Sequence, residues 1–136
     1  IERDLIRGDL DVSEVPQVWN EKMEEYLGVR PEHDSEGCLQ DIHWTYGNFG
    51  YFPTYSLGSL LAAQLDATVR EEFDDLDAKI EAGEFEPIAD WLTDEIHQHG
   101  CRYTTPELVE RATGESLTAE YFLDYAAEKY GDLYEF

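Results

Sequence analysis

A histidine and a tyrosine lie eight residues apart in a stretch rich in glycine and aromatic side chains. His43 follows Asp41 by two positions, so the carboxylate can fix the imidazole tautomer if the loop folds back, which leaves the other ring nitrogen for a ligand. The Tyr51 hydroxyl stays neutral near pH 7 and is a strong donor, as a developing oxyanion requires. The pair therefore predicts a transition-state binding site. A buried histidine and tyrosine in a hydrogen-bonded core is the alternative that these residues leave open.

A loop and the helix after it must position this pair. Residues 29–50 contain several glycines and show no helical periodicity, and long irregular loops in helical domains are often functional. A helix is expected from Tyr51 to about Phe73, with a buried apolar middle at 57–65 and a charged second half that reaches the surface. The pair should thus lie on a loop that leads into a rigid helix.

Capping signals place the other helices. Pro16 marks a first helical turn and Gly28 the end of that helix, whereas Thr104, Pro106 and Glu107 form a capping signal. No alternating run of β-branched residues indicates a strand, so the fold class predicted is all-α. The remaining expected helices are a short one capped by Asp74 or Asp75 and ending at Gly83, one over 86–99, and a last one that starts at Thr118.

The charge of the chain is its most unusual bulk property. Its 136 residues include 32 acidic and 9 basic ones, a formal charge of -23, which argues against nucleic acid as a partner. The acidic residues are spread along the whole chain, and at molar salt the screening length falls to roughly 3 Å. We therefore expect a protein from a halophile. No apolar run approaches a membrane span and no signal peptide is visible, so we expect a cytoplasmic protein with no membrane partner.

The residues around the pair also match a family pattern. Residues 37–44 read Gly-Cys-Leu-Gln-Asp-Ile-His-Trp, which fits Gly-x-x-Gln-Asp-x-His-Trp, and residues 50–55 read Gly-Tyr-Phe-Pro-Thr-Tyr. In these segments, and in weaker ones on both sides, the sequence resembles the carboxypeptidase Taq family of zinc metallopeptidases, also called thermostable carboxypeptidases. The resemblance covers essentially the whole chain.

The resemblance implies an enzyme that removes single amino acids from peptide C-termini by metal-activated water. It implies that Tyr51 and His43 are catalytic. One of them would meet the oxyanion and the other the free carboxylate of the peptide, in an order that the sequence leaves open. It also implies a set of supporting or substrate-binding residues. These are Gln40, Asp41, Trp44 and Tyr55, of which the first two would hold the loop and orient the histidine.

The metal ligands of that family are missing from this sequence. The family binds its metal through a His-Glu-x-x-His helix and a later Glu, and none of the four histidines has that spacing. Zinc, or another divalent metal such as cobalt, is thus expected in the full enzyme and not on this chain. We expect residues 1–136 to be the C-terminal helical domain of the enzyme, without its N-terminal zinc-binding portion. The chain alone is expected to be inactive, whereas the intact enzyme acts on peptides. We also expect a homodimer. The alternative is an inactive remnant that serves as a binding or oligomerisation module.

Overall fold

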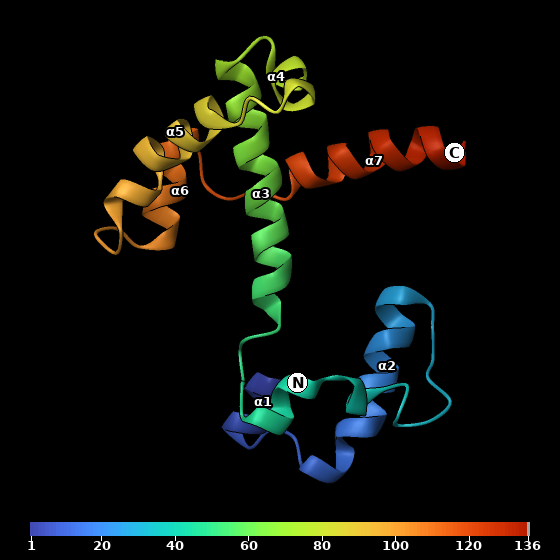
Figure 1. Cartoon of the computed structure of the whole chain (residues 1–136). Coiled ribbons are helices and arrows are strands. Elements are labelled where there is room, and N and C mark those ends of the chain that lie inside the picture. Colours follow the sequence, from blue (N-terminus) through green and yellow to red (C-terminus); the bar gives the residue numbers. More distant parts are fainter. Residues whose placement is uncertain (136) are drawn as a thin grey trace. The chain divides into compact units, whose positions relative to one another are not determined.

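The computed structural model describes residues 1–135, and these residues form helices and turns with no strand, which confirms the all-α prediction (Figure 1). The chain divides into two compact units, one over Ile1–Thr54 and the other from Tyr55 onward. Each unit is described by itself below. No helix among the described residues is long and apolar enough to cross a membrane.

The first unit holds two α-helices and three 3-10 turns. Helix α2 begins with proline in its first turn and ends before Gly28, whose φ of 67° is the left-handed conformation expected of a C-terminal cap. This confirms the predicted helix. The elements in chain order are α1 (Glu2–Arg7), η1 (Val12–Glu14), α2 (Val15–Leu27), η2 (Cys38–Gln40) and η3 (Ile42–Tyr46).

The segment expected to be irregular therefore contains two short 3-10 turns. Between them lies Asp41, whose side chain caps η3 by accepting the backbone N–H of His43. Asp41 and Cys38 are both buried, each 7% exposed, and Val15 on α2 is buried as well. The loop that carries the candidate residues is thus anchored in the small core of this unit.

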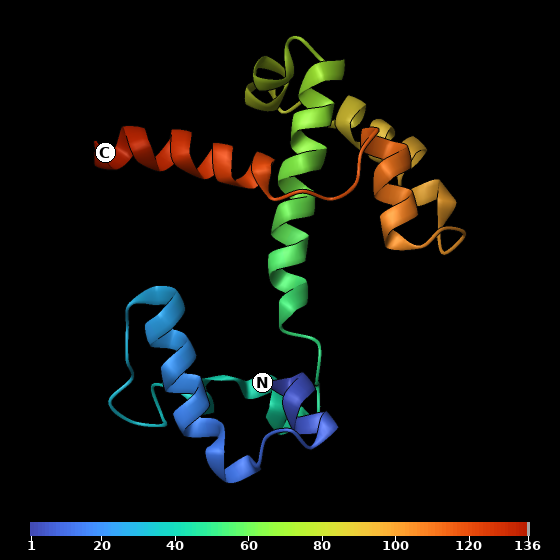
Figure 2. The same ribbon diagram turned by 180° about the vertical axis from the view of Figure 1, so that it is seen from behind.

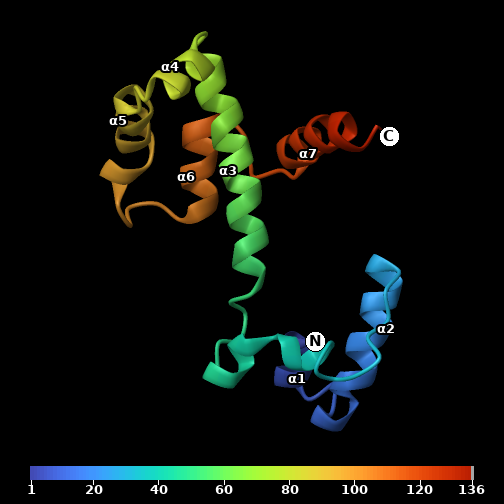
Figure 3. The same cartoon turned by 45° about the vertical axis from the view of Figure 1, so that its right-hand side comes forward.

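The second unit is built around one long helix. Figures 1 and 3 show α5 and α6 on the same side of α3, and Figure 2 shows the linker between α6 and α7 crossing α3 before α7 leads away from it. The elements are α3 (Pro53–Glu72, whose first two residues belong to the first unit), α4 (Leu76–Ala82), α5 (Glu86–Glu95), η4 (His97–His99), α6 (Thr105–Thr113) and α7 (Glu120–Tyr134).

The side chain of Gln64 is the polar centre of this unit. It is fully buried, and its Nε2 donates to Thr113 Oγ1 at 3.0 Å and to the Ser116 carbonyl at 3.3 Å. Its Oε1 accepts the backbone N–H of Thr118 at 3.0 Å. Buried polar groups need such partners, so one glutamine fixes the α6–α7 linker to α3.

The predicted burial along α3 is wrong in part, although Gln64 in the apolar stretch is fully buried and Asp66 in the charged half is exposed as expected. Leu57 in the apolar stretch is 50% exposed, whereas Val69, in the half expected to reach the surface, is only 4% exposed. The physical reason is the position of the partners. The hydrogen bonds of Gln64 and the buried side chain of Leu76 lie at the C-terminal half of α3, and no apolar pattern in a single sequence reveals which end of a helix will be covered.

The helix predicted over 86–99 is also corrected. Helix α5 ends at Glu95 because Ile96 adopts φ −121° and ψ −64°, outside the α-helical range, and a 3-10 turn follows. Ile is β-branched, and its stiff χ1 torsion lowers helix propensity slightly, which is compatible with a break at this position. The predicted capping box of α6 is present, with the Glu107 carboxylate accepting the Thr104 backbone N–H at 2.8 Å.

Candidate functional site

Asp41 and His43 form a close pair within the first unit. Oδ1 of Asp41 accepts the backbone N–H of His43 at 3.0 Å and lies 2.8 Å from Nδ1 of its ring. The Asp41 side chain is 4% exposed and that of His43 is 17% exposed. When Nδ1 carries the proton of the neutral ring and donates to this carboxylate, Nε2 is the acceptor nitrogen.

Two aromatic rings lie against the imidazole of His43. The ring of Phe52 stacks on it with centroids 5.0 Å apart, and the ring of Tyr51 lies at 5.3 Å with an interplanar angle of 37°. Tyr51 and Phe52 are each about half exposed. The histidine and tyrosine that the sequence singles out are therefore neighbours in space, on an accessible part of the unit.

A glutamate that the sequence reasoning missed contacts both ends of the segment between His43 and Tyr51. Glu2 on α1 accepts the indole N–H of Trp44 through Oε1 at 2.8 Å, and it accepts the backbone N–H of Gly50 through Oε2 at 2.7 Å. These contacts span 42 and 48 residues. No local signal of spacing or capping predicts a contact at such a distance along the chain.

The glycine at the start of the loop motif has a packing reason. A Cβ atom at Gly37 would lie 3.2 Å from Oδ1 of Asn20 and 3.4 Å from atoms of both Trp19 and Pro31. Such a contact requires the neighbours to move by a few tenths of an ångström, so glycine favours the close approach of the loop to α2. Burial, followed by the charge of Asp34, raises the pKa of the adjacent Cys38 thiol. A thiol with a raised pKa stays protonated at neutral pH, which argues against a nucleophilic role.

The other predicted site residues have separate positions. Trp44 packs edge-on against Trp19 with ring centroids 6.0 Å apart, so its ring helps to hold the loop against α2. The Gln40 amide donates to the Ser35 carbonyl and so ties the loop to itself. Tyr55 is half exposed in the first turn of α3 and belongs to the second unit. The structure thus brings together His43, Asp41 and Tyr51. Trp44 is the next residue after His43, and its indole N–H donates to Glu2.

This arrangement combines an oriented imidazole with an accessible phenol on one short segment. The phenol O–H can donate to a developing oxyanion or to a carboxylate, and the imidazole can do so through Nε2 when both of its ring nitrogens carry a proton. The two rings lie close enough to contact one small group together. The geometry therefore favours polar recognition of a negatively charged reaction centre or substrate end.

Comparison with known proteins gives the family. The family model described as "Carboxypeptidase Taq (M32) metallopeptidase" matches residues 1–130. The chain belongs to this family. It is 45% identical over 134 residues to carboxypeptidase 1 of Bacillus subtilis, covering 98% of this chain and 27% of that protein. It is 44% identical over 130 residues to thermostable carboxypeptidase 1 of Pyrococcus furiosus, covering 96% of this chain and 26% of that protein.

Solved structures of the M32 family agree with this assignment. The M32 carboxypeptidase of Deinococcus radiodurans R1 matches with a TM-score of 0.88 and 38% identity, covering 99% of this chain and 27% of that one. Metallocarboxypeptidase 1 of Trypanosoma cruzi matches with a TM-score of 0.84 and 48% identity, covering 95% of this chain and 27% of that one. The chain thus spans about a quarter of the length of the M32 relatives that it matches.

M32 enzymes are metallopeptidases, so the family implies a divalent metal. Residues 1–135 contain no group of three His, Cys, Asp or Glu side chains that could hold one. His43, for instance, has its Nδ1 directed to a carboxylate that also caps η3. The donor set of these described residues does not fit a metal centre.

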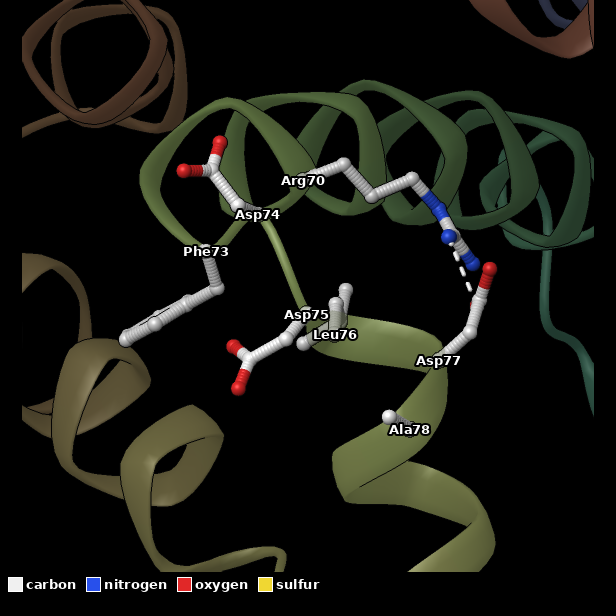
Figure 4. Close-up of a pocket in the computed structure, with 7 residues that line it drawn as sticks. All are labelled: Arg70, Phe73, Asp74, Asp75, Leu76, Asp77 and Ala78. Atoms are coloured by element: carbon white, nitrogen blue, oxygen red, sulfur yellow. Dashed lines mark hydrogen bonds and ion pairs between the residues drawn. The ribbon is translucent and has the colours of Figure 1, made fainter.

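A pocket of about 270 Å³ lies in the second unit, at the turn between α3 and α4 (Figure 4). Three of its charged side chains, those of Arg70, Asp75 and Asp77, are paired within the unit. Arg70 donates to Asp66 at 2.7 Å and to Asp77 at 2.8 Å, and Lys79 pairs with Asp75 at 2.7 Å. These ion pairs raise the pKa of Arg70 and lower that of Asp75. The pocket has the character of a stabilised helix junction and contains none of the predicted site residues.

Proposed function

We propose that this chain is the C-terminal helical region of a longer metallocarboxypeptidase that releases single amino acids from the C-terminal ends of peptides. The observation that carries the proposal is the Asp41–His43–Tyr51 arrangement within a chain that matches the M32 family over residues 1–130. The metal and its ligands, zinc in this proposal, would be supplied by an N-terminal portion of the longer polypeptide.

In this proposal Tyr51 is the principal donor to the transition state. Its hydroxyl would donate to the oxyanion that forms when water attacks the terminal peptide carbonyl. An interaction made mainly with the transition state raises kcat more than it lowers KM. Asp41 would hold the His43 ring so that one nitrogen keeps a constant orientation toward the substrate.

The role of His43 has two versions that experiment separates. If His43 contacts the free carboxylate of the peptide, its replacement by Gln weakens discrimination between a free-acid peptide and the corresponding amide. If it contacts the oxyanion, both substrates lose turnover by the same factor. Comparing kcat/KM for the two peptides in the His43→Gln variant decides between these versions.

The function itself is tested with a full-length chimera, in which this chain replaces the matching region of the B. subtilis relative. The expected result is release of the C-terminal amino acid from a test peptide by the chimera and no release by the isolated chain. A peptide with an amidated C-terminus is the control substrate. A well-folded, metal-loaded chimera without carboxypeptidase activity would contradict the proposal.

An association surface is a second candidate function, favoured by the apolar residues of α7. Leu123, Leu133 and Tyr134 are each at least 60% exposed. Exposed apolar side chains grouped on one helix are typical of surfaces that other protein covers. We propose that α7 contacts a second copy of the chain or the rest of the enzyme. Light scattering of the isolated chain in molar KCl should show a dimer, and a monomer at all concentrations would contradict homodimerisation through this helix.

A further inference from the structure

The residue that the structure adds to the site is Glu2, in the first turn of α1. Both of its carboxylate oxygens accept hydrogen bonds, one from Trp44 Nε1 at 2.8 Å and one from the Gly50 backbone N–H at 2.7 Å. A carboxylate that accepts with both oxygens makes short, charge-assisted bonds. Glu2 is partly buried, so water screens these bonds less than it would at the open surface.

The two donors lie directly beside the two candidate site residues. Trp44 follows His43 in the chain, and Gly50 precedes Tyr51. One carboxylate therefore fixes both ends of the segment between the imidazole and the phenol, whose ring centroids are 5.3 Å apart. A shift of the Trp44 N–H would move the adjacent His43 ring. A shift of the Gly50 N–H would move the adjacent Tyr51 ring.

Each donor is also directed by its own surroundings. Gly50 has φ 74°, a left-handed conformation that other residues adopt only with strain, and this backbone presents its N–H to Glu2. The Trp44 ring is held edge-on by Trp19 and stacks on Phe49 with centroids 6.1 Å apart. The carboxylate thus meets two donors whose directions are already restricted.

We propose that Glu2 is a positioning residue for the site, which sets the distance between the His43 and Tyr51 rings by holding Trp44 and Gly50 on one carboxylate. The inference rests on the function proposed above for those two residues. It extends that function to a residue of α1. Loss of the carboxylate would displace the transition-state donors and leave the substrate-binding surface in place.

The test uses Glu2→Gln in the full-length chimera. The amide keeps the shape of the side chain, but its NH₂ faces one of the two donors and loses that hydrogen bond. Because small misplacements of reacting groups cost up to about a hundredfold in rate, kcat should fall by about tenfold, with KM within about twofold. Glu25→Gln, at an exposed position on α2, is the matched control and should leave kcat unchanged.

A double-mutant cycle with Trp44→Phe separates positioning from stability. Phe keeps an aromatic ring and removes the indole N–H, so Glu2→Gln should lower kcat less in that background than in the parent. If Glu2 only stabilises the fold, Glu2→Gln lowers the melting temperature but leaves kcat of the folded enzyme unchanged, and the proposal is wrong.

The contact itself is tested on the 136-residue chain, independently of any activity. In a ¹⁵N-tryptophan spectrum the Trp44 indole resonance, assigned by its loss in Trp44→Phe, should shift in Glu2→Gln and stay in place in Glu25→Gln. An unmoved Trp44 resonance in Glu2→Gln would overturn the positioning role even if the carboxypeptidase function holds. A shifted resonance with an inactive parent chimera would instead contradict the proposed function alone.

Discussion

The Asp41 carboxylate holds His43 at two points, accepting its backbone N–H at 3.0 Å and lying 2.8 Å from its ring Nδ1. The two contacts have different consequences. The first caps the η3 turn, so it fixes where the backbone of His43 begins its turn. The second fixes the rotation of the ring and the nitrogen that carries the proton. Because one buried oxygen does both, the local fold and the ring orientation are coupled.

Replacing Asp41 by Asn should therefore lower activity more than stability. The Asn oxygen can still accept the backbone N–H of His43, but the amide lacks the charge that favours a protonated Nδ1. Loss of a group that orients a catalytic side chain typically costs about 10–100-fold in activity. The measurement is kcat of Asp41→Asn in the full-length chimera, with Asp9→Asn, at an exposed position of the same unit, as the control. Equal turnover in the two variants would rule out an orienting role for Asp41.

Gly37 and Gly58 offer a matched pair of glycine-to-alanine changes. A Cβ atom at Gly37 meets Asn20 at 3.2 Å, whereas one at Gly58 on α3 meets nothing within 4 Å. Gly37→Ala should lower the free energy of unfolding by about 1–3 kcal/mol through overpacking. Gly58→Ala should raise it by about 0.5–1 kcal/mol, because alanine favours a helix interior.

Urea denaturation followed by circular dichroism measures both glycine variants. The two changes are expected to have opposite signs. A Gly37→Ala variant as stable as the parent would show that the loop does not approach α2 as closely as described.

Gln64 should be among the most sensitive polar positions of the second unit. Gln64→Leu has a similar volume but leaves the Thr118 N–H and the Thr113 hydroxyl without the partner that they have now. A buried polar group that loses its partner costs about 1–3 kcal/mol, so unfolding should shift by that amount. Gln17→Leu, at an exposed position on α2, is the control and should stay within about 0.5 kcal/mol. A Gln64→Leu variant that is equally stable would mean that the α6–α7 linker is not held by this side chain.

Much of the helical framework could be predicted from local signals. The proline and glycine at the ends of α2 and the Thr104–Glu107 capping box of α6 act over three or four residues, so the sequence contains them directly. The break at Ile96 could not be predicted, because the periodicity of apolar residues continues up to Ile96 itself. The covered half of α3 depends on partners far along the chain, and no periodicity reports them.

The candidate site follows the same division. The Asp41–His43 contact joins residues two positions apart, and the spacing was enough to predict it. The sequence places Tyr51 and His43 on a loop that leads into a helix, and the closeness of their rings comes from the structure. The contacts of Glu2 could not be predicted from the sequence, because its hydrogen-bond partners are 42 and 48 residues away along the chain.

The net charge of -23 predicts a stability that depends strongly on salt. Like charges on the surface repel one another in the folded state, and molar salt reduces the screening length to roughly 3 Å. The melting temperature should therefore rise from dilute buffer to molar KCl, as expected of a protein adapted to high salt. Equal melting temperatures in the two buffers would contradict the proposed halophilic origin.

The most direct test of the central claim is the turnover of Tyr51→Phe in the full-length chimera, with Tyr26→Phe, an exposed tyrosine on α2, as the control. One donor to an oxyanion is worth about 10²–10³ in kcat. We expect a loss of about a hundredfold in kcat for Tyr51→Phe, with KM within about twofold and full activity in Tyr26→Phe. A kcat within twofold of the parent would remove Tyr51 from the mechanism and contradict the account.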